Sequence, residues 1–165
     1  ADGIGDACEC VNVNCNDNNA CTDDNCNPLS GCFHTNNTAA CEDGNPCTNG
    51  DVCGGGLCNS GSPITAPPET HAVSAAADKV TYNWLPATFA TRYRVVRGNT
   101  GAFPVGPGGG DEVCFDSLAA TTLVDPAVPT PGLGLWYLSR GENACGLGTY
   151  GLRSDGTPRV TTTCP

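Results

Sequence analysis

One cysteine pattern occurs twice between Cys15 and Cys58. The first copy, residues 15–32, reads CNDNNACTDDNCNPLSGC, and the second copy, residues 41–58, reads CEDGNPCTNGDVCGGGLC. An eight-residue spacer, FHTNNTAA, separates the two copies. A repeated sequence pattern indicates that each copy forms one structural unit. We therefore expect two similar small modules in succession.

The composition of the chain changes abruptly near residue 62. Residues 1–62 hold ten of the 13 cysteines and nine acidic residues but no Lys or Arg, a formal charge of −9. Residues 63–165 hold seven basic and eight acidic residues, a formal charge of −1. This asymmetry predicts an acidic cysteine-rich domain at 1–62, a linker at 63–69 and a second domain at 70–165. It also leads us to expect no nucleic-acid partner.

The first domain has too few large apolar residues to build an ordinary core, so we expect disulfides to stabilise it. Many structural disulfides do not persist in a reducing cytosol, which predicts a secreted or cell-surface protein. No apolar stretch is long enough to insert into a membrane, and without a starting Met or signal sequence the chain looks like a processed, exported product. The cysteines assigned to disulfides are Cys8, Cys10, Cys15, Cys21, Cys26, Cys32, Cys41, Cys47, Cys53, Cys58, Cys114, Cys145 and Cys164.

The pairing of these cysteines cannot be read from their spacing, because four cysteines allow three connectivities. Within each repeat we predict an interleaved pattern, first with third and second with fourth, which leaves Cys8 and Cys10 to pair elsewhere. In the second domain we predict Cys114–Cys145. The third cysteine there, Cys164, would bond to the first domain, bond to another molecule or stay free, and the odd total makes an intermolecular bridge arithmetically allowed.

The segments between the cysteines are rich in turn-forming residues. Asp and Asn side chains accept hydrogen bonds from the local backbone, and we expect positive φ at Asn18 and Gly44. Thr22 and Thr48 should each begin a short ordered run. Tight turns are expected at 27–31 and 54–56.

The same acidic turns offer oxygen ligands to calcium, the one cofactor we consider. A hydrated acidic surface with Asx turns is the alternative. The residues of the expected calcium sites are Asp2, Asp6, Asp17, Asn19, Asp43 and Asn45.

Two resemblances follow from these motifs. The opening ADGIGDAC resembles the end of a thrombospondin type 3 repeat, which implies calcium binding near Asp2 and Asp6. The paired C-x-D-[NG]-N-x-C-T segments resemble repeats of large secreted bacterial surface proteins, which imply no enzymatic role. Asn36, in the sequence Asn36-Asn37-Thr38, is a candidate glycosylation site.

The second domain alternates apolar and polar residues, as half-buried strands do. We expect strands near 80–85, 92–97, 113–118, 121–125, 135–143, 149–154 and 159–163. Pro and Gly clusters separate these segments, and short strands at this spacing predict a β-sandwich. The fold class is thus mostly β, a small disulfide-rich loop domain followed by a sandwich.

The sandwich resembles a fibronectin type III domain. KVTYNWLPA (79–87) and TRYRVVRG (91–98) resemble its B and C strands, and LWYLSRGENACG (135–146) resembles its F strand. Tyr137 and Asn143 occupy the positions of the family's Y-x-V-x-A-x-N pattern, although Ser139 and Gly141 depart from it. In this register Trp136 and Leu138 lie on the face opposite Tyr137 and would form an exposed interface; a register shifted by one residue would instead place Trp136 in the core.

No catalytic motif is present, so we expect no enzyme. We expect a secreted, non-enzymatic structural protein, a subunit that assembles with copies of itself into an extracellular filament or surface layer. The alternative is an adhesion or binding module whose sandwich recognises a glycan or a protein. A knottin-like protease inhibitor would match the cysteine density but not the appended sandwich.

Overall fold

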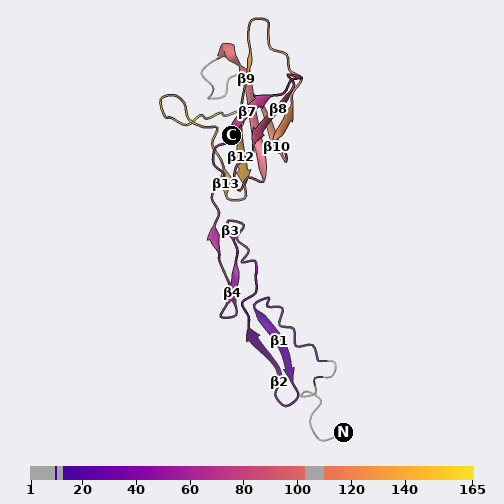
Figure 1. The fold of residues 1–165 in the computed structure, drawn as a ribbon. Helices are drawn as coiled ribbons and strands as arrows, with labels where there is room; N and C mark the ends of the chain where they lie inside the picture. Colours follow the sequence, from indigo (N-terminus) through magenta and orange to yellow (C-terminus); the bar gives the residue numbers. More distant parts are fainter. Residues whose placement is uncertain (1–9, 11–12, 103–109) are drawn as a thin grey trace. The chain divides into compact units, whose positions relative to one another are not determined.

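The computed structural model describes residues 10, 13–102 and 110–165, and these form mainly short strands joined by turns (Figure 1). The chain divides into two compact units, Ala1–Ile64 and Thr65–Pro165. The predicted linker at 63–69 is shared between them, since Pro63 pairs with Thr48 in the first unit and Glu69 bridges to Arg140 in the second. Among the described residues, no helix has the length and apolar character needed to span a bilayer.

Three antiparallel strand pairs build the described part of the first unit. They are the hairpin β1 (Thr22–Asn27) with β2 (Gly31–Asn36), the hairpin β4 (Val52–Gly54) with β5 (Leu57–Asn59), and the pair β3 (Thr48–Asn49) with β6 (Ser62–Pro63). Both hairpin turns lie at the predicted places, and Gly31 and Gly55 adopt φ values of 85° and 66° there. Thr22 and Thr48 begin strands, as expected.

The disulfides of the first unit follow a rule that differs from the predicted one. The first cysteine of each repeat bonds to the fourth, as Cys15–Cys32 and Cys41–Cys58. The third cysteine bonds backward along the chain: Cys53 to Cys21 of the preceding repeat, and Cys26 to Cys10. The interleaved prediction is therefore wrong.

The hairpins explain why. Each hairpin holds its third and fourth cysteines opposite each other, with Cys26 in register with Cys32 and Cys53 in register with Cys58. In the first hairpin Cys26 bonds to Cys10 and Cys32 bonds to Cys15, so the two opposed cysteines have separate partners outside the hairpin. Every cysteine in the described part of the chain is disulfide-bonded, whereas Cys8 lies outside that part.

Two sheets build the second unit (Figure 1). The three-stranded sheet has the order β11-β8-β7, with β7 at His71–Ala75, β8 at Thr81–Leu85 and β11 at Thr122–Val124. The four-stranded sheet has the order β10-β9-β12-β13, with β9 at Arg92–Asn99, β10 at Val113–Leu118, β12 at Leu135–Asn143 and β13 at Gly146–Leu147. A 3-10 turn, η2 (Thr100–Ala102), follows β9.

Five of the seven predicted strands are present, and two are wrong. The segments 149–154 and 159–163 form no strand. Leu152 forms an isolated bridge to Pro158, and the Arg159 N–H donates to the Gly151 carbonyl at 2.9 Å. Gly151 interrupts the first of them at φ 84°. The pattern also missed β7, whose five residues are all exposed and therefore carry no alternation.

The main core lies between the two sheets. Its buried residues come from β8, β9 and β11, namely Trp84, Tyr93, Val95 and Leu123. Tyr82 of β8 stacks on Tyr137 of β12 with ring centroids 3.9 Å apart. The Tyr137 hydroxyl donates to the buried Asp125 carboxylate at 3.0 Å, and Arg97 pairs with the same carboxylate at 2.8 Å. Burial raises the pKa of Tyr137 above its usual 10.0, so this hydroxyl stays a donor.

A second layer of packing covers the opposite face of the four-stranded sheet. Val96, Tyr150 and Cys164 are buried there, and Trp136 and Leu138 pack against them. The predicted register is thus correct, because Tyr137 packs on the other face. The predicted exposed interface at Trp136 and Leu138 is wrong, because the chain's own segment 150–164 covers these side chains.

The disulfide Cys114–Cys164 fastens that covering segment to β10. It replaces the predicted Cys114–Cys145 pair, and Cys164 is fully buried and not free. The pairing could not be read from the sequence because the covering segment is not a strand and has no periodic pattern.

We expect the double substitution Cys114→Ala/Cys164→Ala to lower the free energy of unfolding of the sandwich by about 2–5 kcal/mol. The reason is that the bond closes a 50-residue separation and holds the second packing layer. Chemical denaturation followed by tryptophan fluorescence measures the change. The exposed Ser154→Ala serves as the control and should shift the value by less than about 0.5 kcal/mol. A double variant as stable as the control would contradict this assignment.

Candidate functional site

The candidate site is built on the turn between the first and second cysteines of each repeat. In the first repeat, the Asp17 carboxylate accepts the backbone N–H of Asn19 at 2.8 Å and the hydroxyl of Thr22 at 2.9 Å. The Asn19 side-chain oxygen accepts the N–H of Cys21 at 2.9 Å. These hydrogen bonds with its own side chains stabilise the turn.

The second repeat reproduces this geometry residue by residue. Asp43 accepts the N–H of Asn45 at 2.7 Å and the hydroxyl of Thr48 at 3.2 Å. The Asn45 side-chain oxygen accepts the N–H of Cys47 at 3.0 Å. The C-x-D-x-N-x-C-T pattern thus encodes one hydrogen-bonded turn.

The residue after each aspartate adopts the left-handed conformation that the sequence predicted. Asn18 has φ 60° and Gly44 has φ 81°. Asn and Gly are the two residues that enter this region at least cost. The two repeats therefore use different residues for the same backbone requirement.

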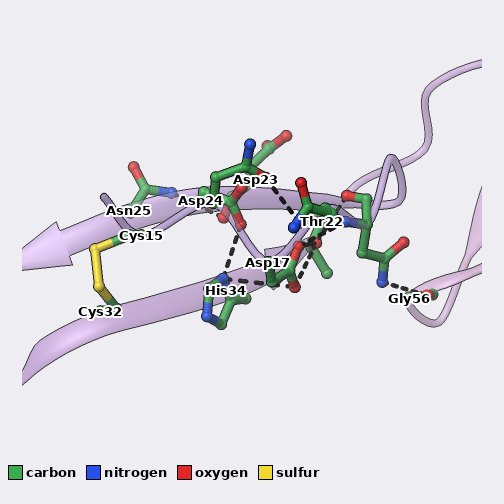
Figure 2. Close-up of polar contacts among 12 residues, drawn as sticks. Cys15, Asp17, Thr22, Asp23, Asp24, Asn25, Cys32, His34 and Gly56 are labelled. Atoms are coloured by element: carbon green, nitrogen blue, oxygen red, sulfur yellow. Dashed lines mark hydrogen bonds and ion pairs between the residues drawn. A yellow bond between two sulfur atoms is a disulfide. The ribbon is translucent and has the colours of Figure 1, made fainter. Parts of the chain in front are cut away.

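In the first repeat an imidazole joins two carboxylates beside this turn (Figure 2). His34 of β2 places its Nδ1 atom 2.8 Å from Asp24 of β1 and 3.6 Å from Asp17. The hairpin register sets this contact, because Asp24 and His34 are cross-strand partners. All three residues are exposed, so water screens their interaction.

Hydrogen bonds in both turns lower the pKa of the aspartates below the usual 3.8. For Asp17 the leading cause is the Asn19 N–H, followed by the Thr22 hydroxyl and the charge of His34. For Asp43 it is the hydroxyl of Ser60, followed by the Asn45 N–H. Both carboxylates are therefore anionic over a wider pH range than free aspartate.

The predicted calcium ligands are engaged in these turns. The side-chain oxygens of Asp17, Asn19, Asp43 and Asn45 already accept backbone N–H groups. The structure brings Asp17 together with Asp24 and His34, a set that the sequence analysis did not assemble. An imidazole suits transition metals better than calcium, so this cluster does not support the calcium assignment. Calcium binding stays a prediction. Asp2 and Asp6 lie outside the described residues.

Sulfur ligands are excluded in the described part of the first unit. Cys21, Cys41 and Cys53 approach one another, but their sulfurs belong to the bonds Cys21–Cys53 and Cys41–Cys58. Metal binding by cysteine requires the thiolate. Disulfides therefore account for this cluster.

Sequence reasoning missed Asp24, which acts through pairing between strands. It lies two positions before the third cysteine of its repeat, as Asp51 does in the second repeat, a signal that the alignment of the repeats could have provided. Asp51 is buried and accepts the N–H groups of Asp43 and Gly61. Asn36, the predicted glycosylation site, is exposed at the end of β2, and its modification stays a prediction.

Comparison with known proteins supports a cysteine-rich repeat in the first unit. Residues 14–37 match a family described as a Dictyostelium (slime mold) repeat. The chain is 40% identical over 58 residues to Protein psiD of Dictyostelium discoideum, a match that covers 34% of this chain and 12% of that protein. The chain therefore spans only a small part of this relative's length. No solved structure matches the chain.

We expect Asp17 and Asp43 to titrate below 3.8 and to lose part of this shift when a donor hydroxyl is removed. Thr22→Val should raise the pKa of Asp17, and Ser60→Ala should raise that of Asp43. Carboxyl ¹³C chemical shifts followed between pH 2 and 6 provide the measurement, with the exposed Thr35→Val as control.

The sign of the linked stability follows from the lowered pKa values. A carboxylate with a lowered folded-state pKa stabilises the fold above the unfolded value, and this contribution is lost as the pH falls through the folded value. The turns should therefore weaken only below about pH 4. Titration at the usual value in the unsubstituted protein would contradict the described geometry.

Proposed function

We propose that this chain is a secreted, non-enzymatic structural protein that forms part of an extracellular filament or surface layer by contact with copies of itself. The observation that carries the proposal is the disulfide rule of the repeats. Each repeat is closed by its own first-to-fourth bond, and Cys21–Cys53 ties one repeat to the next. The two successive repeats are thus joined by a disulfide as well as by the backbone.

This construction suits a protein that must resist force and proteases outside the cell. The hairpins of the first unit expose most of their side chains, as in β1, where four of six residues are exposed and none is buried. Such a unit gains its order from cross-links and turn hydrogen bonds. The likeness to a cysteine-rich repeat family supports a secreted or surface location.

The second unit would provide the contact surfaces, and we propose that it is fibronectin type III-like. In support, β8 lies in one sheet, whereas β9 and β12 are neighbours in the other. Strands B, C and F have this placement in immunoglobulin-like sandwiches. The bacterial source implied by the repeat pattern is part of the same proposal.

A second candidate function is adhesion, in which the sandwich binds a glycan or a protein and the cysteine-rich unit is a stalk. A cavity beside β12 favours this candidate, because arginine side chains line it. The two functions are compatible, since an assembled layer can also bind ligands.

Electron microscopy of the purified chain, with and without Ca²⁺, tests assembly. We expect ordered filaments or sheets, and the double variant Cys21→Ala/Cys53→Ala should reduce their number because it unlinks the repeats. The exposed Ser154→Ala serves as the control and should leave the number of assemblies unchanged. Only dispersed monomers under every condition would overturn the proposal.

Protease resistance provides a second readout. Residues 1–62 contain no Lys or Arg, so trypsin cannot cut them and a broad-specificity protease is needed. We expect the Cys21→Ala/Cys53→Ala variant to be cleaved within this region at least tenfold faster than the unsubstituted chain. The estimate follows from losing about 3 kcal/mol of cross-link stabilisation, reduced for partial local order. Equal cleavage rates would contradict a structural role for this bond.

A further inference from the structure

A cavity of about 340 Å³ lies in the second unit between β12 and the segment that covers it. Arg140 of β12 lines one side, and residues from 148–165 line the rest. The volume is at the lower end of the range for small-molecule sites. The residues that matter for its chemistry are Arg140, Thr149, Tyr150, Arg159 and Thr161.

Arg140 is a buried charge with an incomplete set of partners. The residue is only 9% exposed, and its Nη2 atom donates to the carbonyl of Cys164 at 3.2 Å. Its guanidinium lies 4.6 Å from the ring centroid of Tyr150. The Nε atom is buried and has no hydrogen-bond partner. Burying a guanidinium this way is costly unless an anion or further acceptors complete it.

The half-buried arginines of the same sheet have the carboxylate partners that Arg140 lacks. Arg94 pairs with Glu142 at 2.9 Å and with Asp116 at 3.1 Å, and Arg97 pairs with Asp125. Within the described residues, neither Arg140 nor Arg159 forms an ion pair with a carboxylate. Arg159 donates to the carbonyl of Tyr150 at 3.4 Å, the limit for a hydrogen bond. Among the described residues, the two guanidinium groups at this cavity thus have no carboxylate within ion-pair distance.

The acidic groups nearby do not fill this role. Glu112 is buried and accepts the hydroxyl of Thr161. Glu69 and Arg159 both lie against Gly151, but within the described residues the two side chains do not come within ion-pair distance of each other. Burial raises the pKa of Tyr150 to about 12, so this side chain is neutral, and its hydroxyl donates to the carbonyl of Cys164.

We propose that this cavity binds the oxyanion of an acidic sugar, a carboxylate or a sulfate, with Arg140 and Arg159 as its ligands. Guanidinium groups bind oxyanions through paired N–H donors, and such charge-assisted bonds are about twice as strong as neutral ones. Thr149 and Tyr150 line the same space. A single sugar ring is compatible with the volume. The site does not depend on assembly, so its failure would leave the structural proposal standing.

Isothermal titration calorimetry of the full chain at low salt tests the site with glucuronate, sulfate and neutral glucose. We expect saturable binding of glucuronate and of sulfate and none of glucose. Arg159→Gln should weaken anion binding about tenfold, which corresponds to the loss of one charge-assisted hydrogen bond. Lys79→Gln removes an equal charge at an exposed turn and should change the affinity less than twofold.

Arg140→Lys tests the buried group and keeps its charge, and the loss of the planar fork should weaken binding at least tenfold. Because this variant could unfold, the Arg140 Nε–H resonance of the unsubstituted chain is followed by NMR during the glucuronate titration, and it should shift with the same midpoint as the calorimetry. Absence of saturable binding, or equal weakening by Lys79→Gln and Arg159→Gln, would overturn the proposal. Binding of glucose as tight as that of glucuronate would overturn the assignment to an oxyanion.

Discussion

The disulfide Cys21–Cys53 joins two repeats across 32 positions of sequence, and the order of the first unit depends on it. These two cysteines are 2% and 3% exposed, and they occupy the place that apolar side chains would take in an ordinary domain. A cross-link over a loop of this length removes roughly 3–4 kcal/mol of chain entropy from the unfolded state. The Asp and Asn turns then need only orient the local backbone, because the cross-link keeps the segments together.

The second unit combines a conventional core with a covalently fastened outer layer. Strand β9 has Tyr93 and Val95 in the core between the sheets and Val96 in the outer layer. The outer layer lacks regular strands, and Cys114–Cys164 holds it against the sheet. The same layer encloses Arg140 and creates the cavity beside it. The outer layer thus covers the apolar face of the sheet and forms a cavity lined by Arg140 and Arg159.

Much of the fold could be predicted from the sequence, where local chemistry determines structure. The repeated Asp-x-Asn turns, the positive φ at Asn18 and Gly44, and the strands at Val113–Leu118 and Leu135–Asn143 follow from short-range patterns. Disulfide pairing, the covering of Trp136 and the meeting of Asp24 with His34 depend on how distant segments lie against one another. A single sequence carries no local signal for such contacts, so these features required the structure.

The third cysteine of each repeat bonds backward to an earlier segment, and the order of the first unit depends on this pairing. Peptide mapping by mass spectrometry under non-reducing conditions tests it most directly, after digestion with a protease that does not require Lys or Arg. We expect peptides linked through Cys21–Cys53, Cys10–Cys26, Cys15–Cys32 and Cys41–Cys58. Peptides linked through Cys15–Cys26 and Cys21–Cys32 would place both bonds inside the first repeat and would contradict this pairing.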